Sequence, residues 1–387
     1  MAFIPRLITP VLERAARAFP AVVITGPRRA GKTTILRRVF PDAEIVPLDA
    51  PDVLAAVRAD PRQFLDERRS VTILDEVQNA PELFAYLKER IDRQPRRRGR
   101  WLLAGSQEAP LMQHVTESLA GRAAMVGLLP LSTAESAKVD LLHGGYPEVV
   151  SRPRDRSLWF ESYLQTYLER DVRSVLNVRD LATFRRFLSL LASRTGQMLN
   201  KADLAAPLGL TIPTIGQWIS VLEITGHLLV VPPYFENFGK RLVKTPKVYL
   251  ADSGLACHLL GVTSKAELER SPFKGALFEG YVAAEITKSQ LNQGLRRELY
   301  FFRDHQGLEV DFQFRRGTTT WLVEAKSTST PLPRDAAGLA HLAGRFSSPP
   351  ISMLLYRRAR GGPTSQAITP GVRALDVGEF VKQINTR

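Results

Sequence analysis

One segment constrains the fold more than any other: the apolar run AVVI at residues 21–24, followed after one residue by GPRRAGKT at residues 26–33. The apolar run predicts a strand, the glycines a tight turn, and the apolar spacing in KTTILRRVF a helix. Two glycines at this spacing let successive backbone N–H groups curl around phosphates, and the helix start adds partial positive charge. The segment therefore predicts a nucleotide-binding loop that consists of Gly26, Pro27, Arg28, Arg29, Ala30, Gly31, Lys32, Thr33 and Thr34.

A second segment, VTILDEVQ, supplies acidic partners for this loop. Residues Val71 to Leu74 predict a strand that delivers Asp75 and Glu76 to the sheet edge where the loop also lies. We expect Lys32 to reach the terminal phosphates and Thr33 and Asp75 to hold Mg²⁺, so ATP and Mg²⁺ are the expected ligands. Glu76 would orient and deprotonate the attacking water, which favours hydrolysis over passive binding. The alternative is an acidic pair that only caps the next helix.

Two further polar residues are candidates for the same chemistry. Ser106 ends the apolar strand WLLAGS, where it could sense the γ-phosphate or align water. Arg122, in SLAGR, suits an arginine finger offered to a neighbouring subunit's nucleotide, and its alternative role is a surface salt bridge. The densest basic run lies just before the Ser106 strand; it either contacts polyphosphate or is a solvated turn. It consists of Arg93, Arg96, Arg97, Arg98 and Arg100.

The order of elements predicts an α/β fold with several parts. Strands alternate with helical stretches in the first part, which indicates a parallel sheet; they are expected at Ala21–Ile24, Glu44–Leu48, Val71–Leu74, Trp101–Ala104 and Ala123–Leu129. Residues 1–132 are expected to form this core. A mostly helical lid or connector is expected over 133–180, a three-helix module with a hairpin over 181–262, and a second α/β domain over 263–387.

Composition narrows the class of protein. A chain of 387 residues has room for two or three domains, each with its own core. The formal charge of +14 points toward polyanionic partners such as nucleic acid or nucleotides. No uncharged apolar run approaches the length of a membrane span, and the single cysteine, Cys257, is expected in core packing. The cytoplasm is therefore the expected compartment.

The three-helix module has the pattern of a winged helix. The segment TIPTIGQWISVLEITG would be its recognition helix, with polar groups near the exposed start at Thr211, Thr214, Gln217 and Trp218. The hairpin would be a wing that contacts the DNA backbone through Lys240, Arg241, Lys244 and Lys247. Winged helices also serve as spacers or protein contacts, so this alternative stays open.

The last domain carries a spaced set of acidic residues: Glu279 on an expected helix, Asp311 on a strand, and Glu324 with Lys326 on the next strand. Side chains two apart on a strand share a face, so Glu324 and Lys326 point the same way. Carboxylates that converge with a lysine can bind magnesium and position water against a phosphodiester. The pattern predicts a metal or nuclease-like site, without deciding that it cleaves.

Together these segments resemble prokaryotic AAA-type ATPases whose C-terminal half is a domain of unknown function. The resemblance covers nearly the whole chain and is carried by GPRRAGKT, LDEVQNAPELF, LLAGS, SLAGR, GGYPEVV, YLERDV, KTPKVYLADSGLA and FEGYV…EVDF…VEAKS. It implies an AAA-like core, a winged helix and a C-terminal fold similar to PD-(D/E)XK restriction endonucleases. Asp311 and the triplet Glu324, Ala325 and Lys326 match the nuclease motif, with Glu279 at its helical acidic position and Val310 where proline is common.

The leading hypothesis is an ATP-driven protein that moves or remodels duplex or branched DNA. It would act as a ring or other homo-oligomer, such as a hexamer, with Arg122 completing a neighbour's site. A second hypothesis is a nucleotide-controlled signalling or defence switch whose C-terminal domain binds without cleaving. A third is an Mg²⁺-dependent DNA nuclease licensed by ATP.

Overall fold

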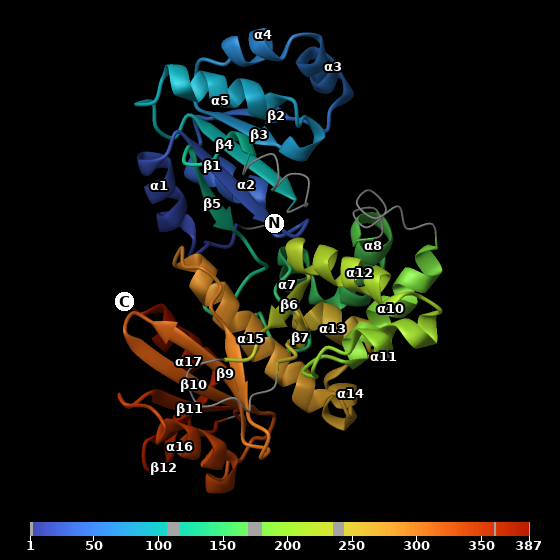
Figure 1. Ribbon diagram of the computed structural model, residues 1–387, viewed down its shortest axis with the longest axis vertical. Helices are drawn as coiled ribbons and strands as arrows, with labels where there is room; N and C mark the ends of the chain where they lie inside the picture. Colours follow the sequence, from blue (N-terminus) through green and yellow to red (C-terminus); the bar gives the residue numbers. More distant parts are fainter. Residues whose placement is uncertain (1–2, 107–116, 169–179, 235–243, 360, 387) are drawn as a thin grey trace.

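The computed structural model describes residues 3–106, 117–168, 180–234, 244–359 and 361–386. It shows three parts (Figure 1): a sheet flanked by helices at one end of the long axis, a second sheet at the other end, and a mostly helical module beside them.

The first part is a five-stranded sheet in the order β2-β3-β4-β1-β5. Its strands are parallel, as the sequence predicts. Helices α1 and α2 cover one face, while α3, α4 and α5 pack on the other. Its elements are α1 (Thr9–Ala18), β1 (Ala21–Gly26), α2 (Lys32–Val39), β2 (Glu44–Pro47), α3 (Pro51–Ala59), α4 (Pro61–Asp66), β3 (Thr72–Asp75), η1 (Val77–Asn79), α5 (Leu83–Arg93), β4 (Trp101–Ser106) and β5 (Ala123–Gly127). All six residues of β1 are buried, because helices cover both faces of a parallel sheet.

The middle part contains three helices followed by a two-stranded antiparallel hairpin, in the element order that the sequence predicts. The helices α10, α11 and α12 begin at side-chain caps from Asp180, Asn200 and Thr211. Its elements are α7 (Pro147–Ser151), η2 (Pro153–Asp155), α8 (Arg156–Tyr163), η3 (Leu164–Leu168), α10 (Leu181–Ser193), α11 (Lys201–Ala205), η4 (Ala206–Leu208), α12 (Ile212–Ile224), β6 (Leu228–Val231), β7 (Lys247–Leu250), α13 (Ser253–Leu259) and α14 (Lys265–Arg270).

The expectation of mostly helical structure after Leu131 is wrong for residues 132–146, which form turns. The Asp140 carboxylate accepts hydrogen bonds from the backbone N–H groups of Leu142 and His143, which stabilises a turn in place of a helix. The predicted segment SLWFESYLQTYLERDVRSVL is helical as far as Leu168, and its remainder lies outside the described residues.

The C-terminal part is a six-stranded mixed sheet in the order β12-β13-β11-β10-β9-β8, packed against a long helix. Its elements are α15 (Lys274–Asn292), β8 (Tyr300–Arg303), β9 (Glu309–Arg316), β10 (Thr319–Lys326), η5 (Pro333–Ala336), α16 (Ala337–Ala343), β11 (Ile351–Tyr356), β12 (Ser365–Thr369), β13 (Val372–Asp376) and α17 (Val377–Asn385). The last two strands and α17 are additions to the elements that the sequence predicted.

One apolar core runs through both the middle and the C-terminal parts, from Leu131 to Ile384. It includes Phe187 of α10, Tyr249 of β7 and Phe312 of β9, and Cys257 is buried in it as expected. Within the described ranges, no single helix is long and apolar enough to cross a membrane. The helical segments Lys201–Leu208 and Ile212–Ile224, which meet at a sharp bend, reach that length and composition only when taken together.

Candidate functional site

The phosphate loop joins β1 to α2 at the carboxyl end of the first sheet. Gly26 has φ 148°, and a Cβ there would lie 2.0 Å from the carbonyl oxygen of Leu128. Gly31 has φ 96° and precedes the first residue of α2. Both conformations favour glycine, which explains why the loop needs these residues. The Lys32 ammonium donates to the carbonyl oxygens of Gly26 (3.0 Å) and Pro27 (3.1 Å), so it lies over the loop.

The hydroxyl of Thr33 and the carboxylate of Asp75 lie together, as predicted for a magnesium site. Thr33 Oγ1 lies 2.8 Å and 2.9 Å from the two carboxylate oxygens of Asp75. Burial raises the pKa of Asp75, and the hydrogen bond from Thr33 partly offsets this rise. Oxygen donors of this kind are the ligands that Mg²⁺ prefers. The two residues fit the ion, and it would neutralise charge on nucleotide phosphates.

Glu76 follows Asp75 directly and has an unusual backbone conformation. Its φ is 54°, a left-handed value that is uncommon outside glycine and often marks a functional position. The Glu76 carboxylate accepts hydrogen bonds from the amide of Gln78 and from Arg28 (3.4 Å). Arg28 belongs to the phosphate loop, so the structure brings the proposed general base to the loop.

A cavity of about 660 Å³ opens beside the loop. The residues from Arg28 to Thr34 and Glu76 line it, together with apolar residues from segments that sequence analysis did not assign to the site. Those apolar residues are Phe3, Ile4, Leu131 and Pro147. Apolar side chains in the same cavity as a phosphate loop suit a nucleotide base. The signal was missed because these side chains come from distant parts of the chain.

Ser106 lies where the strands of the first sheet end, and Arg122 lies where they begin. Ser106 ends β4 and pairs with Gly26, which places its backbone beside the phosphate loop. Arg122 precedes β5, and its carbonyl accepts from the N–H of Ala21 at the start of β1. Its guanidinium makes two hydrogen bonds to Asp92, at 2.6 Å and 2.9 Å. The finger role of Arg122 in a neighbouring subunit's site therefore stays a prediction.

The phosphate loop also contacts the hairpin of the middle part. The hydroxyl of Tyr163 donates to the carbonyl of Arg28 (3.3 Å) and lies 2.8 Å from Nε2 of His227, the residue before β6. Burial, together with the charge of Lys32, lowers the pKa of His227 to about 3, so its ring is neutral. A Cβ on Gly226 would lie 3.0 Å from Cδ of Pro27. This close packing joins the nucleotide loop to the hairpin.

Of the residues predicted to contact DNA, some are exposed, some are buried and some lie outside the described residues. Thr211 caps α12, and its hydroxyl lies 2.8 Å from that of Thr214. Gln217 is exposed, and so is Lys244 just before β7. The expectation that Trp218 is exposed is wrong: it is 4% exposed and packs edge-on against aromatic rings of α10. Of the expected wing residues, Lys240 and Arg241 lie outside the described residues.

The structure brings the four C-terminal candidates together. The carboxylate of Asp311 accepts from the N–H of Ala325 (2.9 Å), and the ammonium of Lys326 lies 2.6 Å from Glu324. Glu279 faces the same cluster from α15. Burial raises the pKa of Asp311, and burial with the charge of Asp311 raises the pKa of Glu279 to about 7 and that of Glu324 to about 8.

Lys247 occupies the middle of this cluster, and its expected place on a DNA-contacting wing is wrong. Its ammonium lies 2.9 Å from Glu279, 2.6 Å from Glu309 and 3.7 Å from Asp311, and its side chain is 5% exposed. Surrounding carboxylates raise its pKa against the opposing effect of burial. Among the described residues, no group of three or more His, Cys, Asp or Glu side chains is arranged to hold a metal ion. The arrangement does not fit the metal that the nuclease resemblance implies.

The sheet, the phosphate loop and the Thr33–Asp75 pair define a P-loop ATPase domain of the AAA type, and residues 18–137 match the family described as an AAA domain. Residues 135–266 and 274–373 match two domains of unknown function (DUF8612 and DUF4143).

The chain belongs to the family of two mycobacterial proteins, the uncharacterized protein Rv2008c of Mycobacterium tuberculosis and the uncharacterized protein Mb2031c of Mycobacterium bovis. It is 35% identical to each over 328 residues, which cover 83% of this chain and 73% of the relative.

Two solved structures give low similarity scores. The Walker-type ATPase paby2304 of Pyrococcus abyssi has 16% identity and a TM-score of 0.41, over 65% of this chain and 94% of that one. Protein VC1899 from Vibrio cholerae has 10% identity and a TM-score of 0.22, over 94% of this chain and 96% of that one. At these scores the likeness carries no weight for fold or function.

Proposed function

We propose that the chain hydrolyses ATP with Mg²⁺ and uses the free energy to remodel duplex or branched DNA as a homo-oligomer. The observation that carries the hydrolytic part is the contact of Thr33 with Asp75 (2.8 Å) beside the Lys32 cradle, at a cavity of about 660 Å³ that Glu76 also lines. In this arrangement the loop N–H groups and Lys32 bind the phosphates, while Thr33 and Asp75 hold the metal ion. Glu76 orients the attacking water and accepts its proton.

The DNA part rests on charge and on exposed polar groups. The chain carries +14, and Gln217 and Lys244 are exposed on the middle module. A basic surface attracts the phosphate backbone of DNA at low salt without sequence preference. The hairpin contact through Tyr163 and His227 supplies a route by which a change in the phosphate loop reaches that module.

The test is the ATPase rate with single-stranded, duplex and four-way-junction DNA, together with particle size with and without nucleotide. We expect stimulation by at least one DNA and a larger particle with ATP. Lys32→Ala should lose nucleotide binding, whereas Glu76→Gln should retain binding and lose turnover. An ATPase rate that no DNA changes, from a protein that binds none of them at low salt, contradicts the DNA role. Turnover by Glu76→Gln at the native rate contradicts the hydrolytic mechanism.

One observation favours a second candidate, a nucleotide-controlled switch whose C-terminal domain does not cleave. Lys247 already supplies a cation to Glu279, Glu309 and Asp311, so a metal ion has no place among them in this arrangement. An ATP-licensed nuclease would need β7 to withdraw this lysine.

Manganese binding separates the switch from the nuclease. The switch predicts no additional Mn²⁺ bound when a non-hydrolysable ATP analogue is added, beyond the ion at the nucleotide. The licensed nuclease predicts further Mn²⁺ that Asp311→Asn removes, and Mg²⁺-dependent DNA cutting that the same variant loses. Lys326→Ala gives a second readout, since it should abolish cutting in the nuclease and change nothing in the switch.

A further inference from the structure

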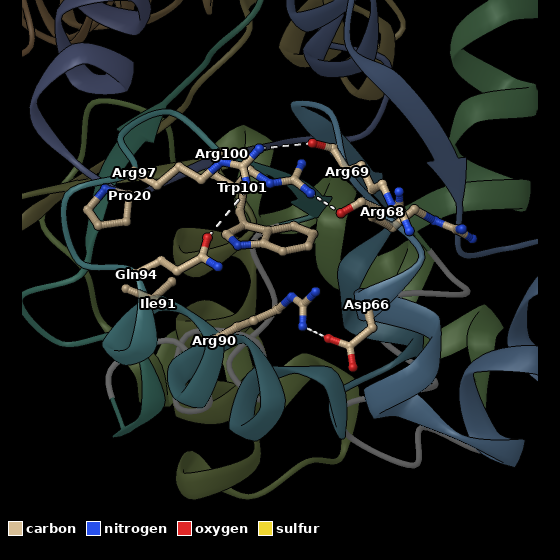
Figure 2. A pocket seen from close by; sticks show the side chains of 10 residues that line it. All are labelled: Pro20, Asp66, Arg68, Arg69, Arg90, Ile91, Gln94, Arg97, Arg100 and Trp101. Carbon is tan, nitrogen blue, oxygen red and sulfur yellow. Dashed lines mark hydrogen bonds and ion pairs between the residues drawn. The ribbon is translucent and has the colours of Figure 1, made fainter.

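A pocket lined by arginines lies at the edge of the first sheet where the strands begin (Figure 2). Its volume is about 320 Å³, and its wall includes Pro20, the residue before β1, and Trp101, the first residue of β4. The phosphate loop follows the other end of β1. The pocket is therefore separate from the nucleotide site and does not rest on the function proposed for that site. Its five arginines are Arg68, Arg69, Arg90, Arg97 and Arg100.

Two of these arginines are held in place by neutral acceptors. The guanidinium of Arg100 donates to the carbonyl of Arg68 and to the hydroxyl of Thr72 (3.2 Å), and it lies 4.7 Å from the Trp101 ring centre. The guanidinium of Arg97 donates to the carbonyl of Arg69 (2.9 Å). Carbonyl and hydroxyl oxygens satisfy N–H groups without cancelling the charge. The basic run is therefore partly folded back onto the sheet edge and is not simply a solvated turn.

The pocket carries more positive than negative charge. Asp66, the carboxylate among its lining residues, pairs with Arg90, and Arg68 pairs with Glu44 (3.1 Å). In the part of the chain that the structure describes, Arg69, Arg97 and Arg100 form no ion pair with a carboxylate. Burial, with the charges of Arg97 and Arg90, lowers the pKa of Arg100 to about 10. Like charges held this close favour a bound anion, which would relieve their repulsion.

We propose that this arginine pocket binds a phosphate group. The planar guanidinium offers paired N–H donors that match phosphate oxygens. Arg69 and Arg97 carry such donors on exposed side chains. The buried Arg100, whose donors go to Thr72 and Arg68, contributes positive charge. Arg69 and Arg97 are exposed, so the pocket opens to solvent and can take a phosphate on a longer molecule. The phosphate comes either from a nucleic-acid backbone or from a free polyphosphate, and the experiment below distinguishes the two sources.

The experiment measures binding of inorganic tripolyphosphate and of a short duplex DNA at low salt. Both are titrated into the full chain with Lys32→Ala, so that the phosphate loop does not take up the anion. The test variant is Arg97→Ala and the matched control is Arg98→Ala, because Arg98 is the next residue, is exposed and does not line the pocket. Trp101 lies in the pocket wall, and its fluorescence, identified with Trp101→Phe, reports occupancy locally.

We expect Arg97→Ala to weaken tripolyphosphate binding about tenfold and Arg98→Ala to weaken it less than about twofold, because the first removes a contact and the second only diffuse charge. If the pocket holds a DNA backbone, Arg97→Ala also weakens duplex binding and lowers the salt slope by about 1, beyond any effect of the control. If duplex binding is unchanged while tripolyphosphate binding falls, the ligand is a free polyphosphate.

Equal effects of the two variants, or no binding of either anion at low salt, overturn the proposal. Both altered side chains are exposed, so the variants should keep the melting temperature of their parent. A variant with Arg69→Ala gives an independent check from the other side of the pocket. It should weaken the same anion as Arg97→Ala, and a loss confined to Arg97→Ala counts against a shared pocket.

Discussion

Replacing Lys247 with methionine tests the buried charge cluster most directly. The substitution keeps an unbranched side chain that is one atom shorter. It removes an ammonium group that lies within 4 Å of three carboxylates, on a side chain that is 5% exposed. Removing one partner of a buried ion pair leaves uncompensated charge and typically costs about 3–5 kcal/mol. We expect Lys247→Met to lower the free energy of unfolding of the C-terminal part by this amount. Lys274→Met is the matched control, since Lys274 is more exposed and, among the described residues, pairs with Glu269 at 3.4 Å; its loss should cost at most about 1 kcal/mol.

The stability that Lys247→Met loses should depend on pH, because the charge of the surrounding carboxylates depends on pH. The folded pKa of Glu279 is about 7, above its usual value of 4.5, so the folded state takes up a proton first as the pH falls from about 7. Protonation removes one of the charges that Lys247 neutralises. The deficit of Lys247→Met should therefore be largest near pH 8 and shrink toward about pH 5. Adding Glu279→Gln to the variant should recover much of the loss near pH 8 for the same reason.

Native-state hydrogen exchange suits this measurement, because it reports local opening in a chain with several parts. The relevant peptides cover β9 and β10, residues 309–326. The reasoning would be refuted if the free energy of opening of these peptides differed by less than about 1 kcal/mol between Lys247→Met and Lys274→Met near pH 8. So would a deficit that grows on acidification, because it would mean that the carboxylates are not the source of the loss.

Three other outcomes are expected. Glu76→Gln should lower the ATPase rate by about 10²–10⁴-fold, measured by turnover, and should keep the nucleotide affinity, measured by calorimetry. A loss of rate and affinity together would mean that Glu76 serves binding. Gly26→Ala should abolish nucleotide binding and lower the melting temperature, because its Cβ would lie 2.0 Å from the Leu128 carbonyl; normal binding would contradict the close approach. The pKa of His227 in the folded state is about 3, so the unfolded chain takes up the proton first as the pH falls. The free energy of unfolding should therefore fall by roughly 5 kcal/mol between about pH 6.5 and pH 3. His227→Gln should flatten this acid limb in a melting-temperature profile, and an unchanged limb would count against it.

The nucleotide loop and the first sheet follow from local sequence signals. Glycines at positions 26 and 31, an apolar strand before them and acidic residues at the end of VTILDE specify a backbone path within short segments. The shared face of Glu324 and Lys326 also follows locally, because strand periodicity fixes which side chains of one strand point the same way. These predictions need no knowledge of how distant parts of the chain pack.

Other features depend on tertiary contacts that local patterns do not encode. Lys247 in KTPKVYL has the same local pattern as a surface lysine on a hairpin, and only packing of β7 against α15 and β9 buries it. The strands SQAIT and VRALD are short and half polar, so their pairing in the second sheet depends on β11. The apolar wall of the nucleotide cavity combines residues from Phe3 to Pro147, which no single motif spans.

The shared core of the middle and C-terminal parts limits how the protein can be divided. A cut near residue 262 would strip α13 and β7 of their contacts with α15 and expose the apolar faces of both fragments, including Tyr249 and Phe312, whose ring centres lie 5.7 Å apart. Fragments made there should aggregate when expressed separately. A division just before Leu131 keeps the buried residues of that core in one fragment, and it cuts the contacts of the phosphate loop with Tyr163 and Gly226. Truncated variants should therefore keep residues 131–387 together as one fragment, because the middle and C-terminal parts share one core.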